Sequence, residues 1–269
     1  MNHLVLTSTS VLDAGYIGLV ESWGSEERII EAARMSVDKG FEGWGPRCKR
    51  CKRPLELVHN QHVCLDEKCE EAGAEPGDEK LLDYLYGNRH HTPFEMAGMI
   101  FEIKAPIFVF REWHRHRTQS YNEMSARYTP LPDENYIPSV DRLLRRGPGF
   151  ESTSKQAMTV KGSDDLTEEA AQQYIENLRE LYNRDERFYQ GALKMGVPKE
   201  LARIHLPVGR YSRMRASANL RNWMQFLSLR MAKDAQWEIR QYAEAACSIL
   251  KGSFPRTIGL FKKGSGLNG

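Results

Sequence analysis

The segment RHRTQSYNEMSARY, residues 115–128, carries side chains whose types and spacing suit an anionic ligand. Arg115, His116 and Arg117 stand together, and Arg127 lies near the end of the segment. Guanidinium groups keep their charge and bind phosphates and carboxylates through two hydrogen bonds at once. The hydroxyl, amide and carboxyl side chains between them add donors and acceptors for a sugar or a heterocycle. This mixture predicts a nucleotide site, anionic at one end and hydrogen-bonding at the other.

Three other interpretations of the cation-rich segment stay open on the residues alone. A short triplet of this kind is common on a solvated polar face that carries surface salt bridges. Contact with nucleic acid is disfavoured because the net charge of the 269 residues is only +2 and no basic stripe repeats. A metal site on His114 and His116 is disfavoured because residues i and i+2 lie on different faces of a helix.

The elements that must position this segment predict an α+β fold. Apolar and polar residues alternate over 3–24 and over 99–104, which is typical of half-buried strands. Ser25 is a candidate N-cap for the helix that follows it. Further helices are expected at 79–86, 107–113, 166–192, 216–250 and in the short segment PKELARIHL. The cation-rich triplet then projects from the end of the 107–113 helix or from the turn after it.

Four segments together carry a family resemblance. RHR followed by seven residues and Ser125 is the signature of flavin-dependent thymidylate synthases, and HHTPFE at 90–95 resembles a second motif of that family. KAPIFVFREW at 104–113 resembles the segment that leads into the signature. NLRNWMQFLSLR with AQWEIRQYA, within 219–243, resembles the last long helix of the family. Because four collinear matches are far more specific than one motif, the chain is identified as a member of this family.

The resemblance implies a reaction and its partners. Members of the family make dTMP from dUMP, take the one-carbon unit from methylenetetrahydrofolate and use FAD reduced by NADPH as the hydride source. Their sites are assembled from several subunits, so a homotetramer with shared active sites is implied here. The implied fold is the α+β fold of the family, with an antiparallel sheet and long helices.

The resemblance also implies site residues by motif position. Contacts to dUMP are implied for Glu112, Arg115, Glu123, Ser125, Arg127, Arg203 and Arg230, with Arg127 and Arg203 on the phosphate. Contacts to FAD are implied for His90, Thr92, Arg115, His116, Arg117, Glu123, Asn219, Arg221 and Gln225. The implied catalytic residues are Arg230 and Ser125. The role implied for Arg230 is to stabilise the ionised, electron-rich pyrimidine ring. Ser125 is interpreted as a positioning residue, because a hydroxyl without a neighbouring base is a poor nucleophile.

One face of the expected 216–250 helix supports a shared site independently of the resemblance. Asn219, Trp223, Phe226 and Arg230 follow at i, i+4, i+7 and i+11, so they are expected on one face. An arginine beside aromatic rings needs a buried partner or an exit to solvent, and a flat anionic pyrimidine would serve as that partner. The alternative is a surface arginine that extends past core aromatic residues.

Three features depart from the family pattern. Gln225 stands where other members carry Asn or His, and Asp234 stands where a His is usual. The polar, Gly-rich loop at 139–165 is atypical in length and has no evident role. None of these changes removes a group that we assign to the core chemistry.

A cysteine-rich insert at residues 41–78 lies outside the family resemblance. Four thiols in two short pairs suit tetrahedral zinc, and they belong to Cys48, Cys51, Cys64 and Cys69. His59 or His62 could replace one of the cysteines. A metal-free loop with reduced thiols and a redox pair are the alternatives. We favour zinc because this Gly- and Pro-flanked segment lacks the apolar residues to fold alone, and a bound metal supplies that free energy.

The composition is that of a globular protein, with 41% hydrophobic and 28% charged residues. We expect one catalytic domain over 1–260 that contains the insert, and a flexible tail over 261–269. No apolar run is long enough to span a membrane and the N-terminus lacks a signal pattern, so a cytoplasmic location without a membrane partner is expected. Two other functions stay open: a related flavoenzyme that modifies C5 of a pyrimidine nucleotide differently, for instance by hydroxymethylation, and a zinc-containing nucleic-acid-binding protein.

Overall fold

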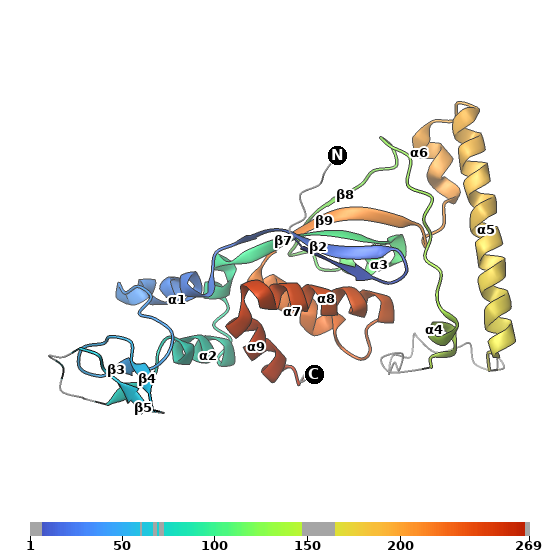
Figure 1. The fold of residues 1–269 in the computed structure, drawn as a ribbon. Coiled ribbons are helices and arrows are strands. Elements are labelled where there is room, and N and C mark those ends of the chain that lie inside the picture. Colours follow the sequence, from blue (N-terminus) through green and yellow to red (C-terminus); the bar gives the residue numbers. More distant parts are fainter. Residues whose placement is uncertain (1–6, 60, 67–68, 70–72, 147–164, 267–269) are drawn as a thin grey trace. The chain divides into compact units, whose positions relative to one another are not determined.

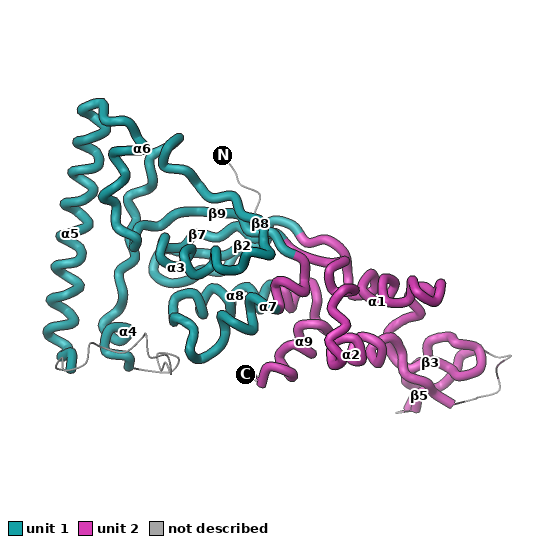
Figure 2. The backbone as a smooth tube through the Cα atoms, turned by 180° about the vertical axis from the view of Figure 1, so that it is seen from behind, with its two compact units in different colours: residues 1–21, 100–218, 225–249 teal, residues 22–99, 219–224, 250–269 magenta. Residues whose placement is uncertain are grey.

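The computed structural model describes residues 7–59, 61–66, 69, 73–146 and 165–266 (Figure 1). They form two compact units, which Figure 2 shows in teal and magenta. Unit 1 comprises residues 1–21, 100–218 and 225–249, and unit 2 comprises residues 22–99, 219–224 and 250–269. Each unit is therefore built from segments that lie far apart in the sequence.

A five-stranded sheet, most of which belongs to unit 1, is the central element of that unit (Figure 1). Its strands lie in the order β1 (Thr7–Val11), β2 (Gly15–Trp23), β7 (Gly98–Pro106), β9 (Tyr211–Asn219) and β8 (Ser120–Glu123). β1 pairs with β2 and β8 pairs with β9, both in antiparallel orientation. Both strand regions predicted from alternation, 3–24 and 99–104, are confirmed where the structure describes them, and residues 3–6 lie outside the described residues.

Helices continue the chain between and after these strands. They are α3 (Ile107–Trp113), α4 (Val140–Leu144), α5 (Glu168–Lys194), α6 (Lys199–Ala202), the 3-10 turn η4 (Arg203–His205), α7 (Leu220–Arg230) and α8 (Trp237–Ser253). The buried rings of Trp113 and Phe226 stack with their centroids 4.5 Å apart. Tyr242 of α8 donates a hydrogen bond of 2.7 Å to the carbonyl of Lys104 in β7. This aromatic core holds the end of α3, from which the cation-rich segment leaves.

Unit 2 contains further helices. They are α1 (Glu26–Arg34), η1 (Met35–Val37), α2 (Glu79–Gly87), η2 (Thr92–Met96) and α9 (Pro255–Gly264). Ser25 caps α1 as predicted, because its hydroxyl oxygen accepts from Arg28 N at 3.3 Å. The buried Glu26 carboxylate accepts from Thr257 N of α9 at 2.6 Å. A satisfied polar contact thus joins α1 to α9 in the interior of this unit.

Residues 41–78, which we call the knob, form two small sheets within unit 2. One pairs β3 (Arg47–Cys48) with β6 (Ala74–Glu75), and the other pairs β4 (Glu56–Val58) with β5 (Gln61–Val63). Among the knob residues that the structure describes, Cys48 is the one apolar side chain in the buried class, at 1% exposed. This arrangement agrees with the prediction that the insert lacks an apolar core of its own.

The predicted helix at 216–250 was wrong. This stretch contains the end of β9, all of α7 and most of α8, and residues 231–236 connect the two helices. Methionine, arginine and alanine favour a helix locally, yet Met214 and Ala216 lie in β9 opposite Glu123 and Tyr121 of β8. Strand pairing therefore overrides the local preference of these residues.

The flexible tail predicted at 261–269 was wrong at its start. Helix α9 continues to Gly264, and Phe261 is 3% exposed, so this part of the tail is packed; residues 267–269 lie outside the described residues. The loop predicted at 139–165 contains α4, and its residues 147–164 also lie outside the described residues. In the part of the chain that the structure describes, no helix has the length and apolar character of a membrane span.

Candidate functional site

The segment after α3 forms a tight turn, residues 114–119, which we call the cation-rich turn. Backbone bonds from His116 N to Trp113 O (3.0 Å) and from Gln119 N to His116 O (3.2 Å) fold it back towards β8. The Tyr121 hydroxyl donates to His116 O at 2.7 Å, and Trp113 Nε1 donates to Gln119 Oε1 at 3.0 Å. These bonds fix the turn with His116 buried, at 8% exposed.

Arg230, the last residue of α7, binds this turn and the end of α3 through its guanidinium group. Nε donates to His116 Nε2 at 2.8 Å, Nη1 to Glu112 Oε2 at 2.7 Å and Nη2 to Glu112 O at 2.8 Å. Because an arginine side chain cannot accept a hydrogen bond, His116 Nε2 is the acceptor and the imidazole is neutral. Burial and then the Arg230 charge lower the pKa of His116 to about 4. The structure therefore brings three predicted site residues, Glu112, His116 and Arg230, into direct contact.

Arg115 and Arg117 flank the buried histidine, and both are exposed. Neither guanidinium group has an ion pair within the described part of the chain. Glu123, the last residue of β8, is also exposed. Two exposed cations two residues apart on this turn form a surface that favours an anion with several charges, such as a diphosphate.

The far end of the segment meets α6. Arg127 Nε lies 3.2 Å from Glu200 Oε2, and both side chains are more than half exposed. Ser125 Oγ accepts from Arg127 N at 3.3 Å, which fixes the backbone between them. Arg203 begins η4 directly after α6 and is half-buried. Arg127 and Arg203, the two arginines predicted to bind phosphate, are therefore linked through α6. Arg127 pairs with Glu200 of that helix, and Arg203 follows its last residue.

Four of the predicted flavin contacts belong to unit 2, and they are His90, Thr92, Asn219 and Arg221. His90 and Thr92 are exposed, and Arg221 forms an ion pair with Glu95. Asn219 ends β9, and its Oδ1 accepts from Asn222 N at 2.9 Å as a cap of α7. The predicted helical face from Asn219 to Arg230 was therefore wrong at its first residue. Gln225, in unit 1, is exposed on α7.

Two residues that shape this site were not predicted. Glu200 pairs with Arg127, and its place in a short amphipathic segment carried no signal for that role. Tyr121 holds the cation-rich turn through its hydroxyl, and burial raises its pKa. An aromatic residue within a polar run was the available signal for Tyr121, because such a residue usually packs inwards.

The knob brings together the four cysteines predicted to bind metal. Their Sγ atoms all lie within 4.8 Å of one another, and Cys48 and Cys69 are 3.5 Å apart, as are Cys51 and Cys64. Backbone N–H groups of Cys51 and Arg50 hydrogen-bond the Cys48 sulfur and lower the pKa of its thiol to about 6. Within the described residues, the group consists of cysteines without His59 or His62. The arrangement could hold a metal ion.

The fold and the site define an α+β protein with an exposed cationic turn. A family model described as Thy1, thymidylate synthase complementing protein, matches residues 18–256. Flavin-dependent thymidylate synthases of Thermus thermophilus and Thermosipho africanus are each 36% identical to the chain over 94% of its length, and the matches cover 77% and 93% of those two proteins. The chain therefore belongs to the flavin-dependent thymidylate synthase family.

Solved structures share this fold. The UMP/dUMP methylase PolB from Streptomyces cacaoi bound with 5-Br UMP is 30% identical, with a TM-score of 0.69 and coverage of 94% of this chain and 96% of that one. The same enzyme bound with 5-Br dUMP is 29% identical, with a TM-score of 0.70 and coverage of 95% and 97%. The predicted α+β class with an antiparallel sheet and long helices is confirmed.

Proposed function

We propose that this member of the family methylates C5 of dUMP to make dTMP, with methylenetetrahydrofolate as carbon donor and NADPH as the reductant of FAD. FAD supplies the hydride when it is bound, while the residues of the chain bind and orient the nucleotide. The observation that carries the proposal is the Arg230 guanidinium group, which Glu112 and His116 hold in a single orientation.

Arg230 is the residue that we propose to act on the pyrimidine ring. Methylation at C5 requires an electron-rich ring, and a guanidinium group at the ring carbonyl and N3 stabilises the negative charge that develops there. Its side chain is 15% exposed, so it is reachable but largely removed from water, where electrostatic interactions are stronger. The three hydrogen bonds that Arg230 donates to Glu112 and His116 leave further N–H groups of the guanidinium for the substrate.

We assign the phosphate of dUMP to Arg127 and Arg203, with Ser125 as a positioning residue. Arg127 is paired with Glu200 at the surface, where an ion pair contributes little free energy. A phosphate carries more negative charge than a carboxylate and can replace Glu200 as the partner of the guanidinium. Glu112 and Arg115 complete the proposed substrate contacts, together with Glu123.

The residues present fit FAD. Arg115 and Arg117 are exposed cations without ion pairs within the described residues, which matches the charge of its diphosphate. The exposed Glu123 carboxylate can accept from a hydroxyl or a ring N–H. The remaining proposed flavin contacts are polar side chains: His90, Thr92, His116, Asn219, Arg221 and Gln225.

The proposal extends to the assembly of the protein. It includes a homotetramer with shared active sites, a cytoplasmic location, zinc on the cysteines of the knob and one catalytic domain over 1–260 that carries the knob. The family resemblance supports the tetramer, and the geometry of the four thiols supports the metal. Size-exclusion chromatography with light scattering tests the tetramer, and a monomer at working concentration contradicts it.

Product analysis tests the reaction. The purified protein is incubated with FAD, NADPH, methylenetetrahydrofolate and dUMP, with UMP in a parallel reaction because the neighbouring structures are of a UMP/dUMP methylase. We expect dTMP. A 5-hydroxymethyl product would instead support a related flavoenzyme that modifies C5 differently. A colourless protein with salt-dependent nucleic-acid binding would support a zinc-containing nucleic-acid-binding protein. Flavin-loaded protein that yields no dTMP contradicts the proposal.

Ligand-induced stabilisation tests the division of the site. FAD and dUMP should each raise the melting temperature, because each binds the folded state. Arg127→Ala should blunt the shift with dUMP far more than the shift with FAD. Equal blunting of both shifts contradicts the assignment of Arg127 to the phosphate.

A further inference from the structure

The four thiols of the knob have the spacing of a tetrahedral metal site. Zinc–sulfur bonds of about 2.3 Å place the sulfur atoms of a tetrahedral site about 3.8 Å apart. Two sulfur pairs here, Cys48–Cys69 and Cys51–Cys64, are 3.5 Å apart, and all four atoms lie within 4.8 Å of one another. A disulfide needs about 2.05 Å, so the four sulfur atoms have the separation of shared ligands rather than of two bonded pairs.

The knob lacks the apolar packing that folds an ordinary domain. Leu57 is 64% exposed, Val58 39% and Leu65 60%, whereas Cys48 is 1% exposed. Its strands are two or three residues long, and an isolated pair of short strands is not stable in water. The free energy that folds this segment must therefore come from another source.

We propose that a single Zn²⁺ ion bound by Cys48, Cys51, Cys64 and Cys69, in place of an apolar core, folds the described residues between Arg47 and Glu75. Four protein ligands close the coordination sphere, so the site is structural and leaves no position for a substrate. Binding displaces the thiol protons and changes no oxidation state, because zinc is redox-inactive. The proposal is independent of the reaction assigned to the protein.

The basic residues around the first cysteine pair have a role in this site. Four thiolates around Zn²⁺ leave two net negative charges, and the cysteines Cys48 and Cys51 lie within the run RCKRCKR, residues 47–53. Part of the run is engaged within the knob, since Lys52 pairs with Glu75 at 2.9 Å and Arg53 with Asp66 at 3.3 Å. Positive charge close to the anionic centre lowers its electrostatic cost, and the exposed Lys49 supplies part of that charge. The run therefore has a function that requires no nucleic acid.

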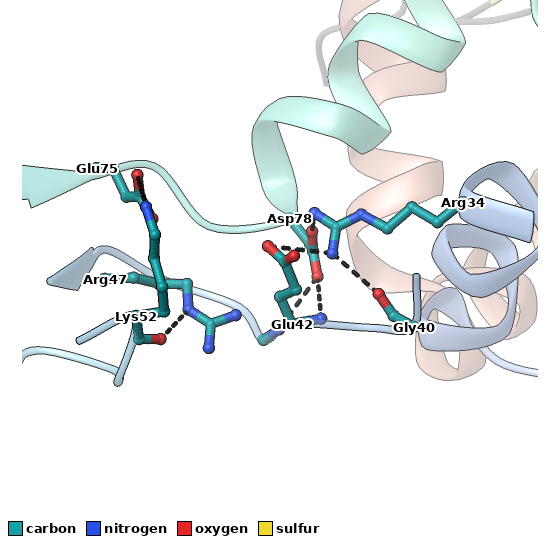
Figure 3. A network of polar contacts seen from close by, with 8 residues as sticks. Arg34, Gly40, Glu42, Arg47, Lys52, Glu75 and Asp78 are labelled. Carbon is teal, nitrogen blue, oxygen red and sulfur yellow. Dashed lines mark hydrogen bonds and ion pairs between the residues drawn. The ribbon is translucent and has the colours of Figure 1, made fainter. Parts of the chain in front are cut away.

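Polar bonds that do not involve the cysteines close the base of the knob, and Figure 3 shows several of them. Asp78, 1% exposed, accepts from Arg34, from Glu42 N at 2.8 Å and from Gly43 N at 3.1 Å. A Cβ on Gly77 would lie 2.1 Å from Gly45 O, so the two chain segments touch there. The base therefore holds both ends of the knob, and loss of zinc should unfold residues 47–75 without opening the base.

Metal analysis of the purified full-length protein tests this proposal. We expect one zinc per chain, a small fraction of that in Cys64→Ser, and recovery in Cys64→His because an imidazole is also a zinc ligand. Cys247→Ala, at a buried cysteine of α8, is the matched control and should keep its zinc. Iron in place of zinc, disulfides between the four cysteines, or full zinc in Cys64→Ser each overturns the proposal.

Hydrogen exchange tests the folding role of the ion, and a charge variant tests the role of the basic run. Chelation should raise amide exchange in residues 47–66 and leave α2 unchanged, and exchange that stays slow throughout the knob overturns the folding role of the ion. Lys49→Gln should weaken zinc binding about threefold at low salt, whereas Lys80→Gln on α2 should not. Equal affinities in both lysine variants overturn the role of the basic run.

Discussion

The cation-rich turn of unit 1 brings like charges together, and the knob of unit 2 brings four thiols together. The two regions are held in different ways. The turn rests on buried aromatic rings, Trp113 and Phe226, and on backbone bonds that need no ligand. The knob has no such rings among its described buried residues and relies on thiols and ion pairs. Where packing positions the side chains, a ligand finds a formed site; where it does not, the ligand is part of the fold.

Arg230→Lys should have the largest effect, because it breaks a site that packing has already formed. A lysine keeps the charge but cannot bond Glu112 and His116 while it faces the pyrimidine. We expect the rate of dTMP formation in single-turnover measurements to fall about 100- to 1000-fold, with little change in the melting temperature. Arg28→Lys, at an exposed arginine of α1, is the control. A rate within a few-fold of the wild type would remove Arg230 from the chemistry.

Acid should weaken the turn through His116. The unfolded chain binds a proton at this residue near its usual pKa of 6.5, whereas the folded chain keeps it neutral down to a pKa of about 4. Because the unfolded state binds more protons in this window, stability is fully present above pH 6.5 and falls as the pH drops towards 4. The expected loss is about 3 kcal/mol.

Urea unfolding over a series of pH values measures this loss. His116→Gln preserves an acceptor for Arg230 but cannot be protonated, so its stability should change less between pH 6.5 and 4 than that of the wild type. Parallel pH profiles for the two proteins would show that His116 is not the group responsible.

Asp78→Asn should act on the base of the knob and leave the metal in place. The amide has one acceptor oxygen, so it cannot serve Arg34 and the N–H groups of Glu42 and Gly43 together, and a buried donor loses its partner. We expect a loss of about 2 kcal/mol in hydrogen-exchange protection of the base. Asp83→Asn, at an exposed position of α2, is the control. Loss of zinc from Asp78→Asn would show that the base and the metal site fold as one.

The sequence predicted the parts of both regions that depend on local pattern. Helix α1 with its Ser25 cap, the helix that ends at the cation-rich turn and the four cysteines are signals within a few residues. The contact of His116 with Arg230 joins residues 114 positions apart, and no local pattern encodes which acceptor a guanidinium reaches. The strand at the start of 216–250 was missed for the same reason, since Ala216 and Ser217 pair with distant residues of β8.

Glu200→Gln should have the smallest effect. The sign of the change in dUMP affinity shows whether Glu200 competes with the phosphate for Arg127 or orients Arg127 for it. As an exposed ion pair, Arg127–Glu200 contributes at most about 0.5 kcal/mol, so the melting temperature should barely change. If the guanidinium binds the phosphate of dUMP, removal of the competing carboxylate should tighten dUMP binding about twofold at low salt.

Calorimetry at two salt concentrations measures the affinity of Glu200→Gln for dUMP, with Glu176→Gln on α5 as the control. The gain should shrink at high salt, since the charges involved are exposed and therefore screened. Weaker dUMP binding in Glu200→Gln would mean that the carboxylate orients Arg127 for the ligand instead of competing with it. The cation-rich segment would then depend on α6 for its order at this end.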